Sequence, residues 1–212
     1  MTNKEIKAIV GDTPHMTLSQ ADEITRLIED NALTNILELG FAHGVSTTYM
    51  AAALKRMNKG GSITCIDLEH SKNRVPRIET LLTQINELDR VNIYFEPTSY
   101  LWRLMKFIEE DDTPRFDLCY LDGAHSWYVD GFAFFLVDKL LKPGGWIVFD
   151  DMNWTYANSP TNSKLEKVKL MPEDEKTTPQ IKKVFELLVK THPNYHNFKE
   201  TKQWGYAQKK IN

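Results

Sequence analysis

Residues 35–57 read NILELGFAHGVSTTYMAAALKRM, and this stretch decides the fold class. The short apolar run Asn35–Leu39 is typical of a buried strand, and the helix-length segment Val45–Met57 follows it. Between them, Gly40 and Gly44 permit a tight turn and let a ligand approach the backbone closely. A strand, a glycine-containing turn and a helix form the first part of a βαβ unit, which predicts a parallel sheet.

The same alternation of apolar runs and helix-length segments continues along the chain. We expect five strands, at Asn35–Leu39, Ser62–Asp67, Val91–Phe95, Phe116–Leu121 and Trp146–Phe149. The helix-length segments that separate them are Val45–Met57, Pro76–Leu88, Tyr100–Glu109 and Ser126–Leu141. Before the fifth strand, Lys142-Pro143-Gly144-Gly145 predicts a turn. This order predicts an α/β fold with a mostly parallel sheet and helices on both faces.

The two ends of the chain extend this core. A capping box at Thr17–Gln20 predicts the start of a helix within an N-terminal helical segment, residues 1–33. Met152–Thr178 is polar and lacks periodicity, so we expect a loop or lid there. Two further strands, Tyr195–Lys199 and Trp204–Gln208, are close enough in sequence to pair as a hairpin.

Composition and charge narrow the class of protein. Of 212 residues, 42% are hydrophobic and 26% are charged, which excludes a disordered or fibrous chain. No repeat or linker divides the chain, so we expect a single domain over residues 1–212. A net charge of −3 argues against a nucleic-acid partner, and no apolar run is long enough for a membrane partner. Cys65 and Cys119 lie in apolar runs without a signal peptide, which predicts free thiols and a cytoplasmic enzyme.

Candidate ligand-binding residues follow the first three strands. In open α/β sheets the ligand lies beyond the carboxyl ends of the strands. The loop after the first strand has Ala42 where a dinucleotide fingerprint needs its second glycine, so it suits a ligand other than a pyrophosphate. Asp67 ends the second strand and either accepts hydrogen bonds from a ribose or caps a helix. After the third strand, Thr98 and Ser99 either cap the next helix or line a flat base.

Acidic residues follow the fourth and fifth strands. Asp122 comes after the fourth, and Asp150 and Asp151 come after the fifth, so three carboxylates are expected to converge. Such charges raise one another's pKa unless a cation or proton intervenes, and oxygen ligands favour Mg²⁺, Mn²⁺ or Ca²⁺. The alternative is that Asp122 orients a ligand while the other two cap a loop. His125 is either a base, since its free pKa is about 6.5, or a capping and packing residue.

Together these features resemble the class I S-adenosylmethionine-dependent methyltransferases. The resemblance rests on the loop Glu38–Thr47, on Asp67 and on Leu140–Gly145 before a strand, and it covers residues 15–209. It implies a Rossmann-like fold with a mostly parallel seven-stranded sheet and a C-terminal antiparallel strand. It also implies a set of residues that bind S-adenosylmethionine: Glu38, Gly40, Gly44, Ser46, Asp67, Ser99 and Asp122.

The resemblance assigns parts of the cofactor to these residues. Gly40 and the stretch Gly44–Ser46 would hold its methionine end, with Glu38 supporting the loop. Asp67 would bind the ribose, and Ser99 would lie beside the adenine.

Within that family, the chain is similar to small-molecule O-methyltransferases of the catechol type and the sugar type. Like them, it has one Asp after the fourth strand and an acidic pair after the fifth, Asp150-Asp151. Asp122-Gly123-Ala124-His125 also resembles the Asp-Gly-x-His signature of a broad group of small-molecule methyltransferases. This similarity implies a divalent cation, Mg²⁺ or Mn²⁺, held by Asp122, Asp150 and Asp151. It also implies that His125 and Asp122 are catalytic, with His125 standing where the catechol type carries a lysine base.

The sequence therefore predicts metal-assisted O-methylation of a small-molecule hydroxyl, either sugar-like or phenolic, and a homo-oligomer is compatible with it. A metal-independent methyltransferase that uses His125 remains an alternative. A nicotinamide-dependent oxidoreductase is another, although Ala42 and the terminal hairpin count against it. A third alternative is a non-catalytic cofactor-binding protein.

Two segments are candidates for selecting the acceptor. These are the Met152–Thr178 loop and, by resemblance to the family, the stretch His15–Thr17. Four aromatic residues near the acidic cluster either wall an acceptor pocket or pack in the core: Trp127, Tyr128, Trp154 and Tyr156.

Overall fold

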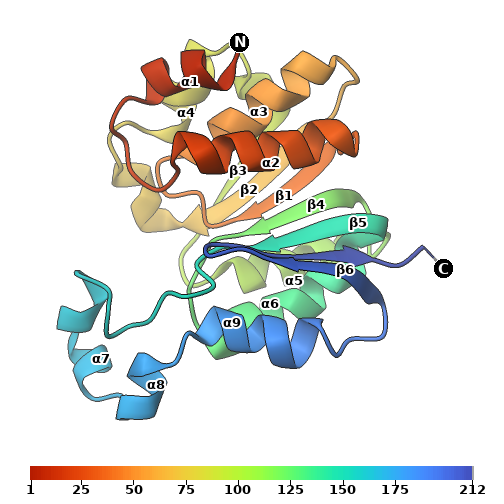
Figure 1. The fold of residues 1–212 in the computed structure, drawn as a ribbon. Helices are drawn as coiled ribbons and strands as arrows, with labels where there is room; N and C mark the ends of the chain where they lie inside the picture. The colour runs from red at the N-terminus through yellow and green to blue at the C-terminus, as the bar shows by residue number, and fades with distance from the viewer. Residues whose placement is uncertain (212) are drawn as a thin grey trace.

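Seven strands form one sheet in the order β3-β2-β1-β4-β5-β7-β6 in the computed structural model, which describes residues 1–211 (Figure 1). The strands are β1 Asn35–Leu39, β2 Ser62–Leu68, β3 Val91–Glu96, β4 Phe116–Leu121, β5 Leu141–Phe149, β6 Tyr195–Glu200 and β7 Gly205–Lys209. Strands β1 to β5 pair in parallel, whereas β7 runs antiparallel to both β5 and β6. The predicted mostly parallel sheet with an antiparallel C-terminal strand is confirmed.

Helices cover both faces of this sheet (Figure 1). One layer contains α1 Asn3–Val10, α2 Leu18–Asp30, α3 Val45–Met57 and α4 Ile78–Gln84. The other contains α5 Tyr100–Glu110, α6 Trp127–Leu140 and α9 Gln180–Val184, which continues into the π-helix η4 Phe185–Val189. Two apolar cores result, one on each side of the sheet, because the alternate residues of a strand point to opposite faces.

Two elements depart from their predicted bounds by more than one residue at an end. Helix α4 is shorter than the expected Pro76–Leu88, since Asn86 takes a left-handed conformation with φ +55° and the 3₁₀-helix η2 Leu88–Arg90 follows. Strand β5 begins directly after α6, at Leu141, and the expected turn becomes an irregularity within it. There the register against β4 shifts between Phe116 and Leu118, and Gly144 has φ +81°.

The segment Met152–Thr178 contains short helices as well as loops. These are the 3₁₀-helix η3 Asn162–Lys164 and the helices α7 Glu166–Lys169 and α8 Glu173–Thr177. Figure 1 shows α7 and α8 beside α9, on the side of the sheet away from α1 to α4. Across residues 1–211, every helix is too short or too polar to cross a membrane.

The strand order places a crevice between β1 and β4. From β1 the chain proceeds through β2 to β3 on one side, and then returns to β4 and β5 on the other. The chain therefore leaves the carboxyl ends of β1 and β4 toward opposite sides of the sheet, and ligands of open α/β sheets bind at such a switch point.

Candidate active site

The loop Gly40–Gly44 after β1 requires glycine at both of its ends. Both glycines have positive φ angles, +85° at Gly40 and +83° at Gly44. A Cβ atom at Gly40 would lie 2.0 Å from the backbone oxygen of Asp122, and one at Gly44 would lie 2.4 Å from Cγ1 of Ile78. The loop therefore packs tightly against the end of β4 and against α4.

Asp67, at the end of β2, fastens this loop through its carboxylate. Its Oδ2 atom accepts hydrogen bonds from the backbone N–H groups of Phe41, at 3.0 Å, and Ala42, at 2.6 Å. Its Oδ1 atom accepts one from the N–H group of Leu68 at 2.6 Å. Asp67 thus shapes the loop in addition to facing the cavity beside it.

Glu38 supports the loop from beneath. It is fully buried and accepts hydrogen bonds from the hydroxyl groups of Ser46 and Thr47, at the start of α3. Burial raises the pKa of the Glu38 carboxyl to about 8, although the two hydroxyl groups oppose this shift. The Glu38 carboxyl group therefore supports the loop as a buried, hydrogen-bonded group that binds its proton more tightly than a free glutamate.

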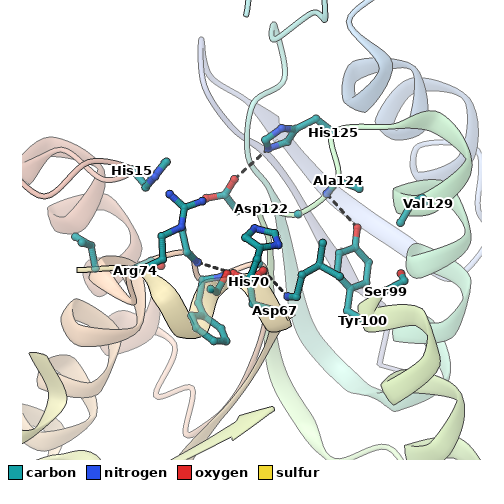
Figure 2. A pocket seen from close by; sticks show the side chains of 18 of the residues that line it. His15, Asp67, His70, Arg74, Ser99, Tyr100, Asp122, Ala124, His125 and Val129 are labelled. Carbon is teal, nitrogen blue, oxygen red and sulfur yellow. Dashed lines mark hydrogen bonds and ion pairs between the residues drawn. The ribbon is translucent and has the colours of Figure 1, made fainter. Parts of the chain in front are cut away.

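A first cavity of about 280 Å³ opens at the carboxyl ends of β1, β2 and β4 (Figure 2). Five of the seven residues predicted to bind the cofactor line it: Gly40, Ser46, Asp67, Ser99 and Asp122. Glu38 and Gly44 lie behind the lining. Ser99 also caps α5, since its hydroxyl accepts a hydrogen bond from the N–H group of Leu101 at 3.2 Å. Ser99 therefore caps the helix, as one alternative predicted, and it also lines the cavity, while its place beside an adenine stays a prediction.

The loop after β4, Asp122–Ser126, is held by two buried side chains that sequence reasoning missed. Asp130 on α6 is fully buried, and it accepts hydrogen bonds from the Tyr100 hydroxyl and from the N–H group of Ser126 at 2.7 Å. The same hydroxyl of Tyr100 accepts one from the N–H group of Ala124 at 3.2 Å. No sequence signal marks this pair, because its members lie on different helices.

At the tip of this loop, His125 lies between two carboxylates. Its Nε2 atom is 3.3 Å from Oδ1 of Asp122 and 3.1 Å from Oδ2 of Asp151. Burial would lower the pKa of His125, but the neighbouring Asp122 and Asp151 outweigh it and raise this pKa to about 9. The ring of Trp154 lies against the imidazole, with centroids 4.9 Å apart.

One potential metal-binding group occurs among residues 1–211, and it consists of Asp122, His125 and Asp151. Their candidate ligand atoms all lie within 4.8 Å of one another. The two carboxylates are suitable donors for Mg²⁺ or Mn²⁺, whereas an imidazole is the more usual ligand of zinc and other transition metals. Asp122 and Asp151 therefore fit a divalent cation, with His125 beside them.

Asp150, the third predicted metal ligand, lies beside this group but outside it. Its Oδ2 atom accepts a hydrogen bond from the Tyr120 hydroxyl, and its Oδ1 atom accepts one from the N–H group of Asp151 at 2.6 Å. Burial raises the pKa of Asp150 to about 8, and the charges of Asp122 and Asp151 add to the increase. Both carboxyl oxygens are therefore already hydrogen-bonded.

A second cavity of about 600 Å³ adjoins the acidic cluster. The N-terminal segment borders it, as expected for His15–Thr17, and Asp122, His125, Asp150 and Asp151 form its floor. Met152–Thr178 contributes none of the described lining residues. The two cavities share His15, Asp122 and His125.

The four aromatic residues do not form a common wall at this cavity. Trp127 and Tyr128 line a separate surface hollow beside α8 and α9. Trp154 packs on Tyr156, with ring centroids 4.8 Å apart, and Tyr156 is buried. Only Trp154 reaches the cluster, through His125.

Comparison with known proteins identifies the class to which this fold and site belong. Residues 37–152, more than half of the chain, match the Methyltransf_24 family, which is described as a methyltransferase domain. The chain belongs to this family, and the predicted enzyme class of methyltransferase is confirmed. No match to the chain was found among curated protein sequences.

Solved structures with the same fold include several methyltransferases. An O-methyltransferase from Bacillus cereus, solved in complex with SAH, has 19% identity and a TM-score of 0.68, covering 98% of this chain and 90% of its own. TomG, a Streptomyces achromogenes O-methyltransferase in complex with SAM, has 16% identity and a TM-score of 0.69, with coverage of 99% and 88%. SAH-bound PaMTH1 from Podospora anserina has 14% identity and a TM-score of 0.67, with coverage of 98% and 87%. The predicted Rossmann-like methyltransferase fold is confirmed.

Proposed function

We propose that the chain transfers a methyl group from S-adenosylmethionine to a hydroxyl oxygen of a small, sugar-like or phenolic molecule, assisted by a divalent cation. The observation that carries this proposal is the position of Asp122 and His125 in the wall common to both cavities. A methyl donor in the first cavity and an acceptor in the second would meet beside these side chains. The SAM and SAH bound by structures of the same fold support this choice of donor.

Asp122 and Asp151 are the residues that would hold the cation. Mg²⁺ is usually bound by one or two carboxylates and keeps positions for water or substrate oxygen. When bound there, the cation would bind the acceptor oxygen and lower the pKa of its hydroxyl group. Asp150 orients Asp151, because its Oδ1 atom accepts the hydrogen bond of the Asp151 N–H group.

In its neutral form, His125 would accept the hydroxyl proton, because a cation held by Asp122 and Asp151 would oppose the rise in its pKa that these two carboxylates cause. The carboxylates of Asp122 and Asp151 lie 3.3 and 3.1 Å from its Nε2 atom, so they stabilise the imidazolium that proton transfer creates. The deprotonated oxygen would then attack the methyl carbon as its bond to sulfur breaks. Binding of the two reactants in these cavities would bring them near attack geometry, an effect worth about 7–11 kcal/mol in favourable cases.

Metal binding by the cluster is tested with Mn²⁺ alone in a titration calorimeter. Asp151→Asn should weaken Mn²⁺ binding by about a hundredfold, whereas Asp150→Asn should weaken it by about tenfold, as typical for a supporting partner. Asp112→Asn, a change on the exposed loop before β4, is the matched control. Equal losses for Asp150 and Asp151 would instead make both residues ligands.

Turnover is tested by following S-adenosylhomocysteine production with a panel of sugars and phenols. His125→Ala should abolish methylation and leave S-adenosylhomocysteine affinity nearly unchanged, because the imidazole acts on the acceptor. Removal of divalent cations with a chelator should also abolish turnover, and Mg²⁺ or Mn²⁺ should restore it. Full activity in the chelator would favour the metal-independent alternative.

A further inference from the structure

The loop after β2 carries two polar groups that lack partners. It consists of the 3₁₀-helix η1 Glu69–Asn73 and Arg74, and the Arg74 N–H group closes it by donating to the Ser71 carbonyl at 3.2 Å. Ser71 is 4% exposed, and its hydroxyl oxygen is buried without a hydrogen-bond partner. Both Ser71 and Arg74 line the first cavity.

The guanidinium group of Arg74 is also unpaired. It forms no ion pair or side-chain hydrogen bond within residues 1–211, whereas Arg77, three residues later, pairs with Glu79 at 2.7 Å. Among the described residues that line the first cavity, Arg74 alone carries a permanent positive charge. A partly buried guanidinium that has no carboxylate partner loses part of its hydration, and no ion pair offsets this loss. An anionic ligand would therefore stabilise it.

Arg74 also lies close to an opposite charge that it does not neutralise. Figure 2 shows its side chain directed into the cavity, toward His15 and Asp122. Asp122 is engaged with His125, and it forms no ion pair with Arg74 in the described part of the chain. A cavity lined by an unpaired guanidinium and by the Asp122 carboxylate is complementary to a zwitterion, such as the ammonium and carboxylate of an amino acid.

We propose that Arg74 and Ser71 form a subsite for the methionine carboxylate of S-adenosylmethionine, with Asp122 facing the methionine ammonium. The inference rests on the proposed function and adds residues that the glycine loop does not supply. The guanidinium binds the carboxylate through two parallel N–H···O hydrogen bonds, and the Ser71 hydroxyl donates a third.

The test compares two ligands of the full-length chain by calorimetry. S-adenosylhomocysteine has the amino-acid carboxylate, whereas 5′-methylthioadenosine keeps the nucleoside and sulfur but lacks it. Arg74→Ala should weaken S-adenosylhomocysteine binding by about tenfold to a hundredfold and change 5′-methylthioadenosine binding by less than about twofold. Arg74→Lys should recover part of the loss, and Ser71→Ala should cost about threefold.

Arg77→Ala is the matched control and should leave both affinities unchanged, because Arg77 pairs outside the cavity. Equal weakening of both ligands by Arg74→Ala would mean that Arg74 only supports the loop, and would overturn the subsite. Unchanged S-adenosylhomocysteine binding by Arg74→Ala would also overturn the subsite. The guanidinium would then be free to bind an anionic acceptor, and the proposed function would stand. A wild-type chain that binds neither ligand would refute the proposed function itself.

Discussion

The loops after β1 and β4 lie at neighbouring strand ends and line the same cavity, but they are held in different ways. The Gly40–Gly44 loop is held by its own glycines and by the carboxylate at the end of β2. The Asp122–Ser126 loop is held by Tyr100 and Asp130, which belong to helices. The glycines and the strand-end Asp67 that hold the first loop can be recognised in the sequence. The contact between Tyr100 and Asp130 that holds the second loop forms only when α5 packs on α6.

The two loops also limit each other. The backbone oxygen of Asp122 occupies the space that a side chain at Gly40 would need. A change in one loop therefore displaces the other, and with it the carboxylate that faces both cavities.

The largest expected effect comes from Gly40→Ala. The added methyl group would lie 2.0 Å from the Asp122 oxygen, and φ is +85°. We expect the free energy of unfolding to fall by about 5 kcal/mol and S-adenosylhomocysteine binding to be lost. Gly60→Ala is the control, since Gly60 has φ +76° but no atom within 4 Å of the added Cβ, and should cost only about 1 kcal/mol. Urea unfolding measures the free energy of unfolding of both variants. Equal losses in Gly40→Ala and Gly60→Ala would show that the contact with the Asp122 oxygen has no effect on stability.

The next effect concerns Glu38, which supports the first loop from below. The pKa of Glu38 in the folded chain is about 8, above its ordinary value of 4.5. Between these values the folded chain binds more protons than the unfolded chain, so this group makes the free energy of unfolding fall as pH rises. Glu38→Gln removes this dependence.

Urea unfolding at pH 5 and pH 8.5 measures that change. From pH 5 to pH 8.5, the free energy of unfolding of Glu38→Gln should rise by up to about 4 kcal/mol relative to that of the wild type. The exposed Glu110→Gln at the end of α5 is the control and should show no such gain. If Glu38→Gln has the same effect at both pH values, the carboxyl group does not titrate in this window.

The smallest effect is expected from Tyr100→Phe, which loosens the second loop. The substitution removes a donor to the buried Asp130 and an acceptor for the N–H group of Ala124, so we expect a loss of about 2 kcal/mol. Mn²⁺ affinity should fall as well, because the same loop carries Asp122 and His125. Tyr94→Phe, whose hydroxyl makes no hydrogen bond in the described chain, should change neither quantity. Unaltered Mn²⁺ binding in Tyr100→Phe would show that the loop keeps its shape without the pair.

Short-range patterns in the sequence predict the layered α/β fold, the glycine loop, and the positions of Asp67 and Asp122 at strand ends. These features depend on local periodicity and on turns that only glycine adopts, so neighbouring residues suffice to predict them. The acidic pair after β5 marks the limit of such reasoning. Successive residues at a strand end point in different directions, so the contacts of this pair depend on the packed fold. There Asp151 faces His125, whereas Asp150 is hydrogen-bonded to Tyr120.

Tertiary structure likewise decided what surrounds the site. Tyr100 and Asp130, the unpaired Arg74, and the N-terminal border of the second cavity come from separate parts of the chain. Their meeting depends on how helices and loops pack on the sheet, and no short-range pattern encodes such contacts. Local sequence patterns therefore show at which strand ends the functional side chains lie. Packing between distant segments sets which of those side chains contact one another.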